Sequence, residues 1–99
     1  MLRHVAVFTF TPEASNEQVA ALADGLARLP AQIPDIRDYR FGPDAGLSDN
    51  TDDFAVVADF DDLEGYRRYA SHPAHQDLLA TLLRPILAGR HSVQFAVNE

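Results

Sequence analysis

Tyr69, His72, His75 and His4 are the side chains of this sequence whose chemistry suits proton transfer. The first three fall within seven residues, YASHPAH at positions 69–75, and His4 stands near the start of the chain. An imidazole can serve as a general base because its unperturbed pKa, about 6.5, lies close to working pH. A tyrosine in contact with it can polarise a carbonyl while the imidazole takes the proton. The segment is therefore a candidate acid–base site.

Each histidine also has a purely structural interpretation. His72 can cap a helical segment that begins at Pro73, where the missing N–H of proline costs nothing. His75 can be a half-buried residue that is hydrogen-bonded to backbone, and His4 can be a satisfied histidine at the start of a strand. The sequence leaves both interpretations open for His4 and for His75.

A metal site is the third interpretation, and the spacing argues against it. His72 and His75 are three residues apart, as two ligands on one helical face would be, but Pro73 interrupts that spacing. His4 is the single further candidate ligand, whereas zinc sites use three or four protein ligands. The sequence therefore predicts no metal and no cofactor.

Composition excludes several classes of partner. The chain has 99 residues with 15 acidic and 8 basic side chains, all eight of them arginine, and a net charge of −7. An acidic surface argues against nucleic acid and against anionic lipid, and no apolar run approaches the ~20 residues of a membrane span. The chain has no cysteine, which fits the cytoplasm. We expect a cytoplasmic protein with no nucleic-acid or membrane partner.

The candidate residues must be positioned by a sheet and two helical regions. Strand-like patterns cover residues 3–10, 35–41, 54–60 and 91–97. The first and third are apolar on both sides, which is typical of a strand that is covered on both faces. The second is more polar and is therefore expected nearer an edge of the sheet.

The first helix is predicted between the first two strands. Ser15 and Gln18 have the spacing of a capping box. An apolar stripe with a period of 3.6 follows and runs to about Leu29, where Pro30 is expected to end the helix.

The second helical region follows the third strand. Asp61 and Glu64 are predicted to cap its start, and Pro73 is expected to begin a new helical segment within it. A leucine-rich stripe follows, and Pro85 with Gly89 is expected to end it.

The order β-α-β-β-α-β predicts a fold of the α+β class, the ferredoxin-like sandwich, with a four-stranded antiparallel sheet and helices on one face. Residues 1–99 are expected to form a single domain. Two helices leave one apolar face of the sheet uncovered. The predicted solution is a homodimer whose two sheets pack face to face.

A ligand pocket is predicted between the sheet and the helices. The even positions of the first strand place His4, Ala6 and Phe8 on one side. If that side faces the helices, the candidate catalytic residues Tyr69, His75 and His4 share a mostly apolar pocket, the usual make-up of a small-molecule site. Its predicted lining is Ala6, Phe8, Leu22, Leu26, Val56, Ala58, His72, Leu78 and Leu79.

Three segments resemble a known family, the stress-responsive α/β-barrel domain family (Dabb). They are RHVAVFTF at 3–10, IPDIRDYRFG at 33–42 and YASHPAH at 69–75. The resemblance covers nearly the whole chain and implies a homodimer, the dimeric α/β barrel, with a pocket in each subunit. One plant member is a cofactor-free polyketide cyclase that uses a tyrosine and a histidine of this segment. Those positions match Tyr69 and His75, and its strand histidine matches His4.

The chain departs from that cyclase at two positions. A second pocket tyrosine falls on Leu26, and an acid of the last strand falls near Gln94. A polar relay built on those groups is therefore absent or different, and activity on the cyclase's own substrate is not supported.

We therefore predict a homodimeric stress-responsive α/β-barrel domain protein with an apolar small-molecule pocket, to which the sequence assigns no particular reaction. One alternative is a cofactor-free enzyme, similar to a polyketide cyclase or a lyase, that uses Tyr69 and His75 on a small aromatic or polyketide-like ligand. The second alternative is a scaffold or regulatory subunit of a larger enzyme.

Overall fold

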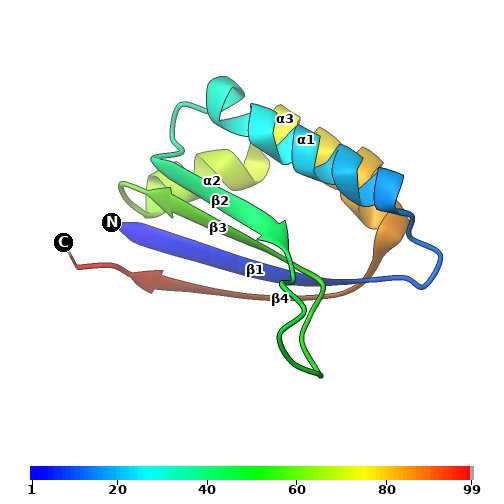
Figure 1. Cartoon of the computed structure of the whole chain (residues 1–99). Helices are drawn as coiled ribbons and strands as arrows, with labels where there is room; N and C mark the ends of the chain where they lie inside the picture. The colour runs from blue at the N-terminus through cyan, green and yellow to red at the C-terminus, as the bar shows by residue number, and fades with distance from the viewer. Residues whose placement is uncertain (99) are drawn as a thin grey trace.

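The computed structural model describes residues 1–98 and contains one four-stranded sheet with helices packed against it (Figure 1). Glu99, the last residue of the predicted domain, lies outside the described residues. The strands are β1 (Leu2–Phe10), β2 (Asp38–Pro43), β3 (Phe54–Phe60) and β4 (Leu87–Ala96). The helices are α1 (Asn16–Gln32), α2 (Leu63–Ser71) and α3 (Pro73–Leu78), continued by a π-helical turn η1 (Leu79–Leu83) and a 3₁₀ turn η2 (Arg84–Ile86).

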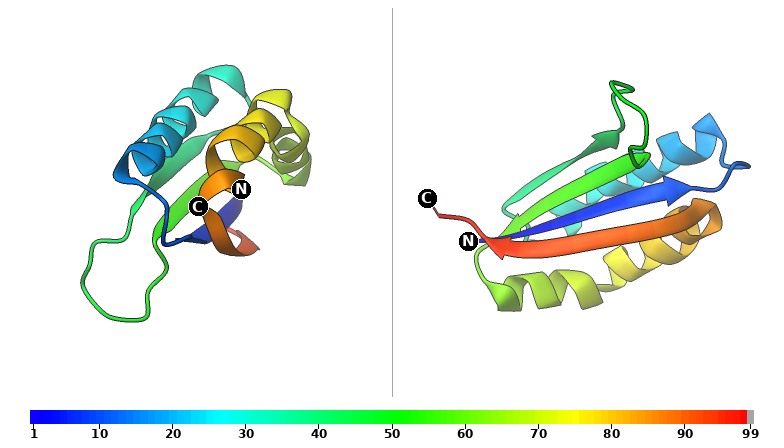
Figure 2. Two further views of the ribbon diagram at one scale, coloured as in Figure 1. Left: turned by 90° about the vertical axis from the view of Figure 1, so that its right-hand side faces the viewer. Right: turned by 90° about the horizontal axis from the view of Figure 1, so that it is seen from below.

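The sheet has the strand order β2-β3-β1-β4, with every neighbouring pair antiparallel. All helices lie on one face of it, as the two perpendicular views in Figure 2 show. This arrangement confirms the predicted ferredoxin-like α+β fold.

Alternation along the two central strands separates the two faces of the sheet. His4, Ala6 and Phe8 of β1 are buried on the helix side, opposite Ala58, Val56 and Phe54 of β3 in the register. Side chains from α1 and α3 pack against them, and Leu22 and Leu26 supply part of the shared core. The even-numbered side of β1 therefore faces the helices, as the sequence predicts.

Within residues 1–98, no helix lies over the other face of the sheet. Val57, Val5 and Val93 form a row across β3, β1 and β4, and Val93 and Phe95 are 56% and 46% exposed. We call this surface, made of the odd-numbered residues of β1 with their partners on β3 and β4, the open sheet face. It carries the apolar groups that the double-sided strand pattern predicts.

Helix α1 starts as predicted and ends three residues later than predicted. The Ser15 side chain accepts from the backbone N–H of Gln18, whose own side chain accepts from the N–H of Ser15, so the capping box is confirmed. Pro30 lies inside the helix rather than ending it. In the last turn its missing N–H removes a single hydrogen bond, and the Ile33 N–H still closes the helix onto the Leu29 carbonyl.

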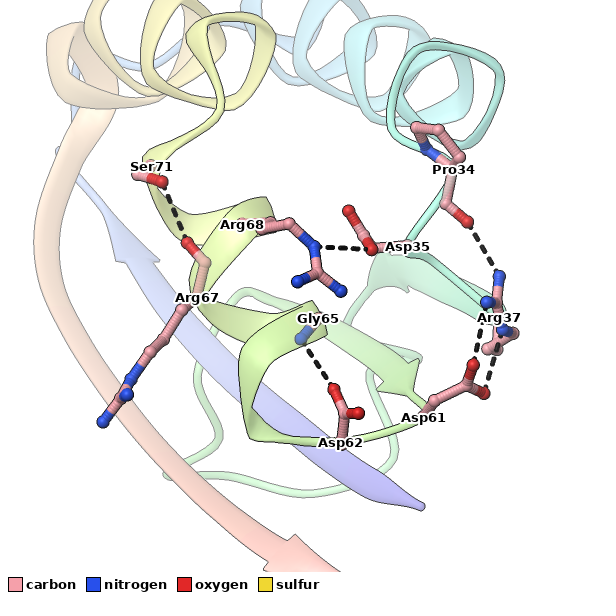
Figure 3. Close-up of polar contacts among 9 residues, drawn as sticks. All are labelled: Pro34, Asp35, Arg37, Asp61, Asp62, Gly65, Arg67, Arg68 and Ser71. Carbon is pink, nitrogen blue, oxygen red and sulfur yellow. Dashed lines mark hydrogen bonds and ion pairs between the residues drawn. The ribbon is translucent and has the colours of Figure 1, made fainter.

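Helix α2 is capped by Asp62 and not by Asp61. The Asp62 carboxylate accepts from the Gly65 N–H at 2.9 Å, while Asp61 is turned outward and pairs with Arg37. Arg68 on α2 donates to Asp35 in the segment before β2 (Figure 3). These contacts fix the position of α2, the helix from which Tyr69 projects into the core.

Further element bounds differ from the sequence-based expectation, most of all the starts of β2 and β4. Strand β2 begins at Asp38 instead of residue 35, and β4 begins at Leu87 instead of residue 91. Pro85 does not end the helical segment, because it sits at an early position of the 3₁₀ turn where no N–H is needed. Gly89 belongs to β4, where a Cβ would lie 2.7 Å from Thr9 Oγ1.

Candidate functional site

A small cavity lies between the sheet and the helices. Its volume is about 20 Å³, room for about one water molecule. Most of the predicted pocket residues line it, and three further residues join them. The lining is His4, Ala6, Phe8, Leu22, Leu26, Tyr39, Val56, Tyr69, His75, Leu78, Leu79, Leu83 and Arg90.

Ala58 and His72 were predicted in this lining and lie outside it. Ala58 is fully buried, and its short methyl group ends within the packed core. The His72 ring is held at the start of α3, where Nδ1 accepts from the Ala74 N–H at 3.0 Å. His72 is thus the N-cap of α3 with Pro73 at the first helical position, which is the structural interpretation offered for this pair.

His75 is brought onto Tyr69 by the break between α2 and α3. The two ring centroids are 4.2 Å apart, although residues six apart on one unbroken helix would point to different sides. The His75 Nδ1 lies 3.1 Å from the Ala70 carbonyl. A carbonyl only accepts, so Nδ1 carries the proton and Nε2 of the neutral ring is free to act as a base. Burial lowers the pKa of His75, which keeps the ring neutral near pH 7.

Tyr69 is paired with a second tyrosine that the sequence did not point to. The hydroxyls of Tyr39, on β2, and Tyr69, on α2, lie 2.8 Å apart. One hydroxyl donates to the other, so one O–H of the pair stays available to a ligand. Burial raises the pKa of Tyr69 to about 12 and raises that of Tyr39 further, so both phenols stay protonated. The pair is therefore a hydrogen-bond donor and not a base.

His4 reaches the same cavity from the sheet. Its Nδ1 lies 2.7 Å from the Oε1 of Gln94 on the neighbouring strand, and its ring centroid lies 6.4 Å from that of Tyr69. Burial lowers the pKa of His4. The Gln94 amide can fix the tautomer of the ring, but it carries no charge with which to stabilise an imidazolium.

Replacing Gln94 with glutamate should raise the pKa of His4. A carboxylate beside Nδ1 favours the charged ring, and we expect the midpoint of the His4 titration to rise by about one pH unit or more. Titration of the imidazole C–H resonances by NMR measures it. Gln94→Ala removes the hydrogen bond without adding a charge and should leave the pKa low. An unchanged midpoint in Gln94→Glu would contradict the contact.

Arg90 is the second lining residue that the sequence analysis missed. It is paired with Phe8 in the register of β1 and β4, so its side chain leaves the sheet on the helix side. It is exposed and lies at the edge of the cavity. Among the described residues 1–98, Arg90 is the single formally charged member of the lining, apart from the titratable histidines. The alternation along β4 would have placed Arg90 on the helix side, but the strand was predicted to begin at residue 91, one residue too late to include it.

Residues 1–98 contain neither a candidate metal-binding cluster nor a helix that could span a membrane. Across residues 1–98, no three histidine, aspartate or glutamate side chains are grouped so that they could hold a metal ion. Over the same range, no helix has the length and apolar character needed to cross a bilayer. The lack of a metal or cofactor requirement and the cytoplasmic location stay predictions.

The sheet order, the one-sided helices and the cavity between the layers define a ferredoxin-like α+β protein. The chain belongs to the stress responsive A/B barrel domain family, whose profile matches residues 2–97. The family predicted from the three sequence segments is thereby confirmed.

Solved and curated proteins agree with this assignment. A dimeric ferredoxin-like protein of unknown function from Thermobifida fusca is 44% identical and superposes with a TM-score of 0.90 over 97% of this chain and 90% of its own. An uncharacterized protein of Streptomyces coelicolor is 30% identical over 78 residues, 77% of this chain and 80% of its own. The hydroxynitrile lyase of Passiflora edulis has a TM-score of 0.85 over 99% of this chain and 94% of its own, but at 16% identity it shares the fold alone.

Proposed function

We propose that this chain forms a homodimer in which each subunit binds a small aromatic or polyketide-like carbonyl compound and transfers a proton on it without a cofactor. One observation carries the proposal: His75, which holds its proton on Nδ1, and the hydrogen-bonded pair of Tyr39 and Tyr69 line one mostly apolar cavity. Base and donor are the two groups that proton abstraction beside a carbonyl requires.

The proposed step removes a proton from the carbon next to the ligand's carbonyl group. His75 takes this proton at Nε2, while the Ala70 carbonyl holds Nδ1–H and so fixes the ring. The free O–H of the tyrosine pair donates to the carbonyl oxygen as its negative charge develops. His4, with its own Nδ1 held by Gln94, offers a second proton-accepting nitrogen.

Ligand entry requires the lining to open, since the cavity holds about one water molecule. Leu79 and Leu83 lie on η1, a single π-helical turn. Single π-helical turns within helices are frequent at functional sites. Displacement of these two leucines would extend the cavity toward solvent without disturbing the sheet.

The homodimer is supported by the open sheet face. A contiguous apolar surface that joins Val5, Val57, Val93 and Phe95 is unusual on a monomer. The related Thermobifida fusca protein is described as dimeric. We propose that two open sheet faces pack against each other and form the barrel that gives the family its name.

Exchange of the methyl protons of acetophenone for deuterium in D₂O tests the proposed reaction. We expect His75→Ala to slow the exchange by about 10²–10⁴-fold, because a positioned base contributes that much. Because burial lowers the pKa of His75, the rate should stay level through neutral pH and fall only in acid. NMR follows the exchange. His72→Asn removes an imidazole but keeps a good helix cap, so it should exchange at the wild-type rate.

A second candidate function is ligand binding without turnover, which the nearly closed cavity favours. Saturation-transfer NMR with acetophenone separates the two candidates. Binding with no exchange above the buffer rate would establish a binding module and overturn the catalytic proposal. Exchange that is equally fast in wild type and His75→Ala would remove His75 from the reaction.

A further inference from the structure

We propose that the natural ligand carries a carboxylate, bound at Arg90, on the side of the molecule away from the reacting carbonyl group. This inference rests on the proposed function and names the substrate class: an aromatic or polyketide-like ketone that is also an acid. Arg90 then determines specificity at the mouth of the pocket.

The first observation is the position of Arg90 between two hollows. It lines the buried cavity with His75 and Tyr69. It also lines a second hollow of about 120 Å³ on the outside, together with Leu79, Leu83, Arg84 and Leu87. The two spaces share Arg90, Leu79 and Leu83, so these residues form the partition between them. A ligand that enters past the two leucines passes the Arg90 guanidinium.

The second observation is the charge at this place. Among residues 1–98, no aspartate or glutamate lines either hollow, although the chain has 15 acidic residues and a net charge of −7. Within residues 1–98, neither Arg84 nor Arg90 takes part in an ion pair, whereas five other arginines do. Two uncompensated guanidinium groups on an acidic protein make a local positive potential that attracts an anion.

The third observation is that the charge of Arg90 acts inside the cavity. The guanidinium helps to lower the pKa of His4 and of His75, and it opposes the rise in the pKa of Tyr69. In each case this effect is smaller than that of burial, but within residues 1–98 Arg90 is the one charged side chain that acts on all three groups. A ligand anion at Arg90 would therefore lie close to the candidate catalytic groups.

The chemistry of these groups selects a carboxylate. A guanidinium presents a planar fork of N–H donors that matches a carboxylate with two parallel hydrogen bonds. The leucines of the partition suit an apolar body, and the tyrosine pair suits a carbonyl oxygen at the inner end. A compound with an acid at one end and a ketone at the other satisfies all three parts of the pocket.

Two probes that differ in this one feature test the inference: 4-acetylbenzoate and its neutral counterpart 4-acetylbenzamide. Both carry the same aryl ketone. We expect wild type to bind the benzoate about tenfold more tightly at low salt, since hydrogen bonds to charged groups are the stronger ones. The preference should shrink as salt is added, because Arg90, which binds the carboxylate, is exposed to solvent. Titration calorimetry measures both affinities.

Arg90→Gln should remove the preference by weakening the benzoate alone, with the affinity for the amide unchanged. Arg90→Lys retains the charge without the fork and should keep part of the preference. Arg28→Gln makes the same charge change on α1, outside both hollows, and should leave the preference at its wild-type value. Circular dichroism of each variant verifies the fold.

Equal binding of the two probes by wild type would overturn the carboxylate assignment, and so would a loss of affinity for both probes in Arg90→Gln. If acetophenone exchange still depends on His75 in that case, the proposed function stands without this inference. If neither probe binds and acetophenone neither binds nor exchanges, the proposed function falls and the inference falls with it.

Discussion

Val7→Asp is expected to separate the proposed homodimer into monomers. Val7 lies on the open sheet face, where its register partners are Ala55 on β3 and His91 on β4. An aspartate at this position would bring an unpaired carboxylate into an interface between two sheets. Burial of a charge without a partner is strongly unfavourable, so we expect association to weaken by about a hundredfold or more.

Sedimentation equilibrium at micromolar concentration measures this effect. Ala20→Asp is the matched control, since it adds the same charge on an exposed position of α1, on the opposite side of the sheet. A wild-type protein that sediments as a monomer would overturn the proposed dimer, and so would a Val7→Asp variant that remains dimeric.

Leu22→Ala is expected to destabilise the fold strongly. Leu22 is fully buried on α1, between the helices and β1. Truncation of a buried leucine to alanine costs about 2–5 kcal/mol, because the transfer free energy is lost and a cavity is left behind. This is a large share of the roughly 5–15 kcal/mol that stabilises a domain.

Chemical unfolding with urea measures the loss. Leu47→Ala is the matched control: Leu47 is 90% exposed in the loop before β3, and its truncation should change stability by no more than about 0.5 kcal/mol. Since Leu22 also lines the cavity, its truncation should enlarge the space beside His4 and Tyr69. A small apolar probe such as indole should then raise the stability of Leu22→Ala more than that of wild type. Equal losses in the two leucine variants would contradict the assignment of Leu22 to the core.

Local patterns in the sequence determined much of the secondary structure. The capping box of Ser15 and Gln18 and the cap of α3 by His72 depend on hydrogen bonds between residues two or three apart. Their geometry follows from the backbone dihedrals of one turn, so the residue types suffice to predict them. The two-sided apolar pattern of β1 and β3 likewise predicted the faces of the sheet.

Some local predictions were wrong because tertiary contacts outweigh local preference. Pro30 was expected to end α1, but the helix continues to Gln32, and Ile33 directly after it is buried in the core. Asp61 and Asp62 are equally suited to cap a helix by type. Pairing of Asp61 with Arg37, which lies 24 residues away, leaves Asp62 as the cap of α2.

The sequence by itself determined the family, the fold class and the candidate residues His4, Tyr69 and His75. Only the tertiary structure decided which groups surround them. The hydroxyl pair of Tyr39 and Tyr69 joins residues 30 apart, and the contact of His4 with Gln94 joins residues 90 apart. Such contacts depend on the register of the strands and on where the helices settle on the sheet. No spacing along the chain encodes these distances, because the packing of the whole core sets them.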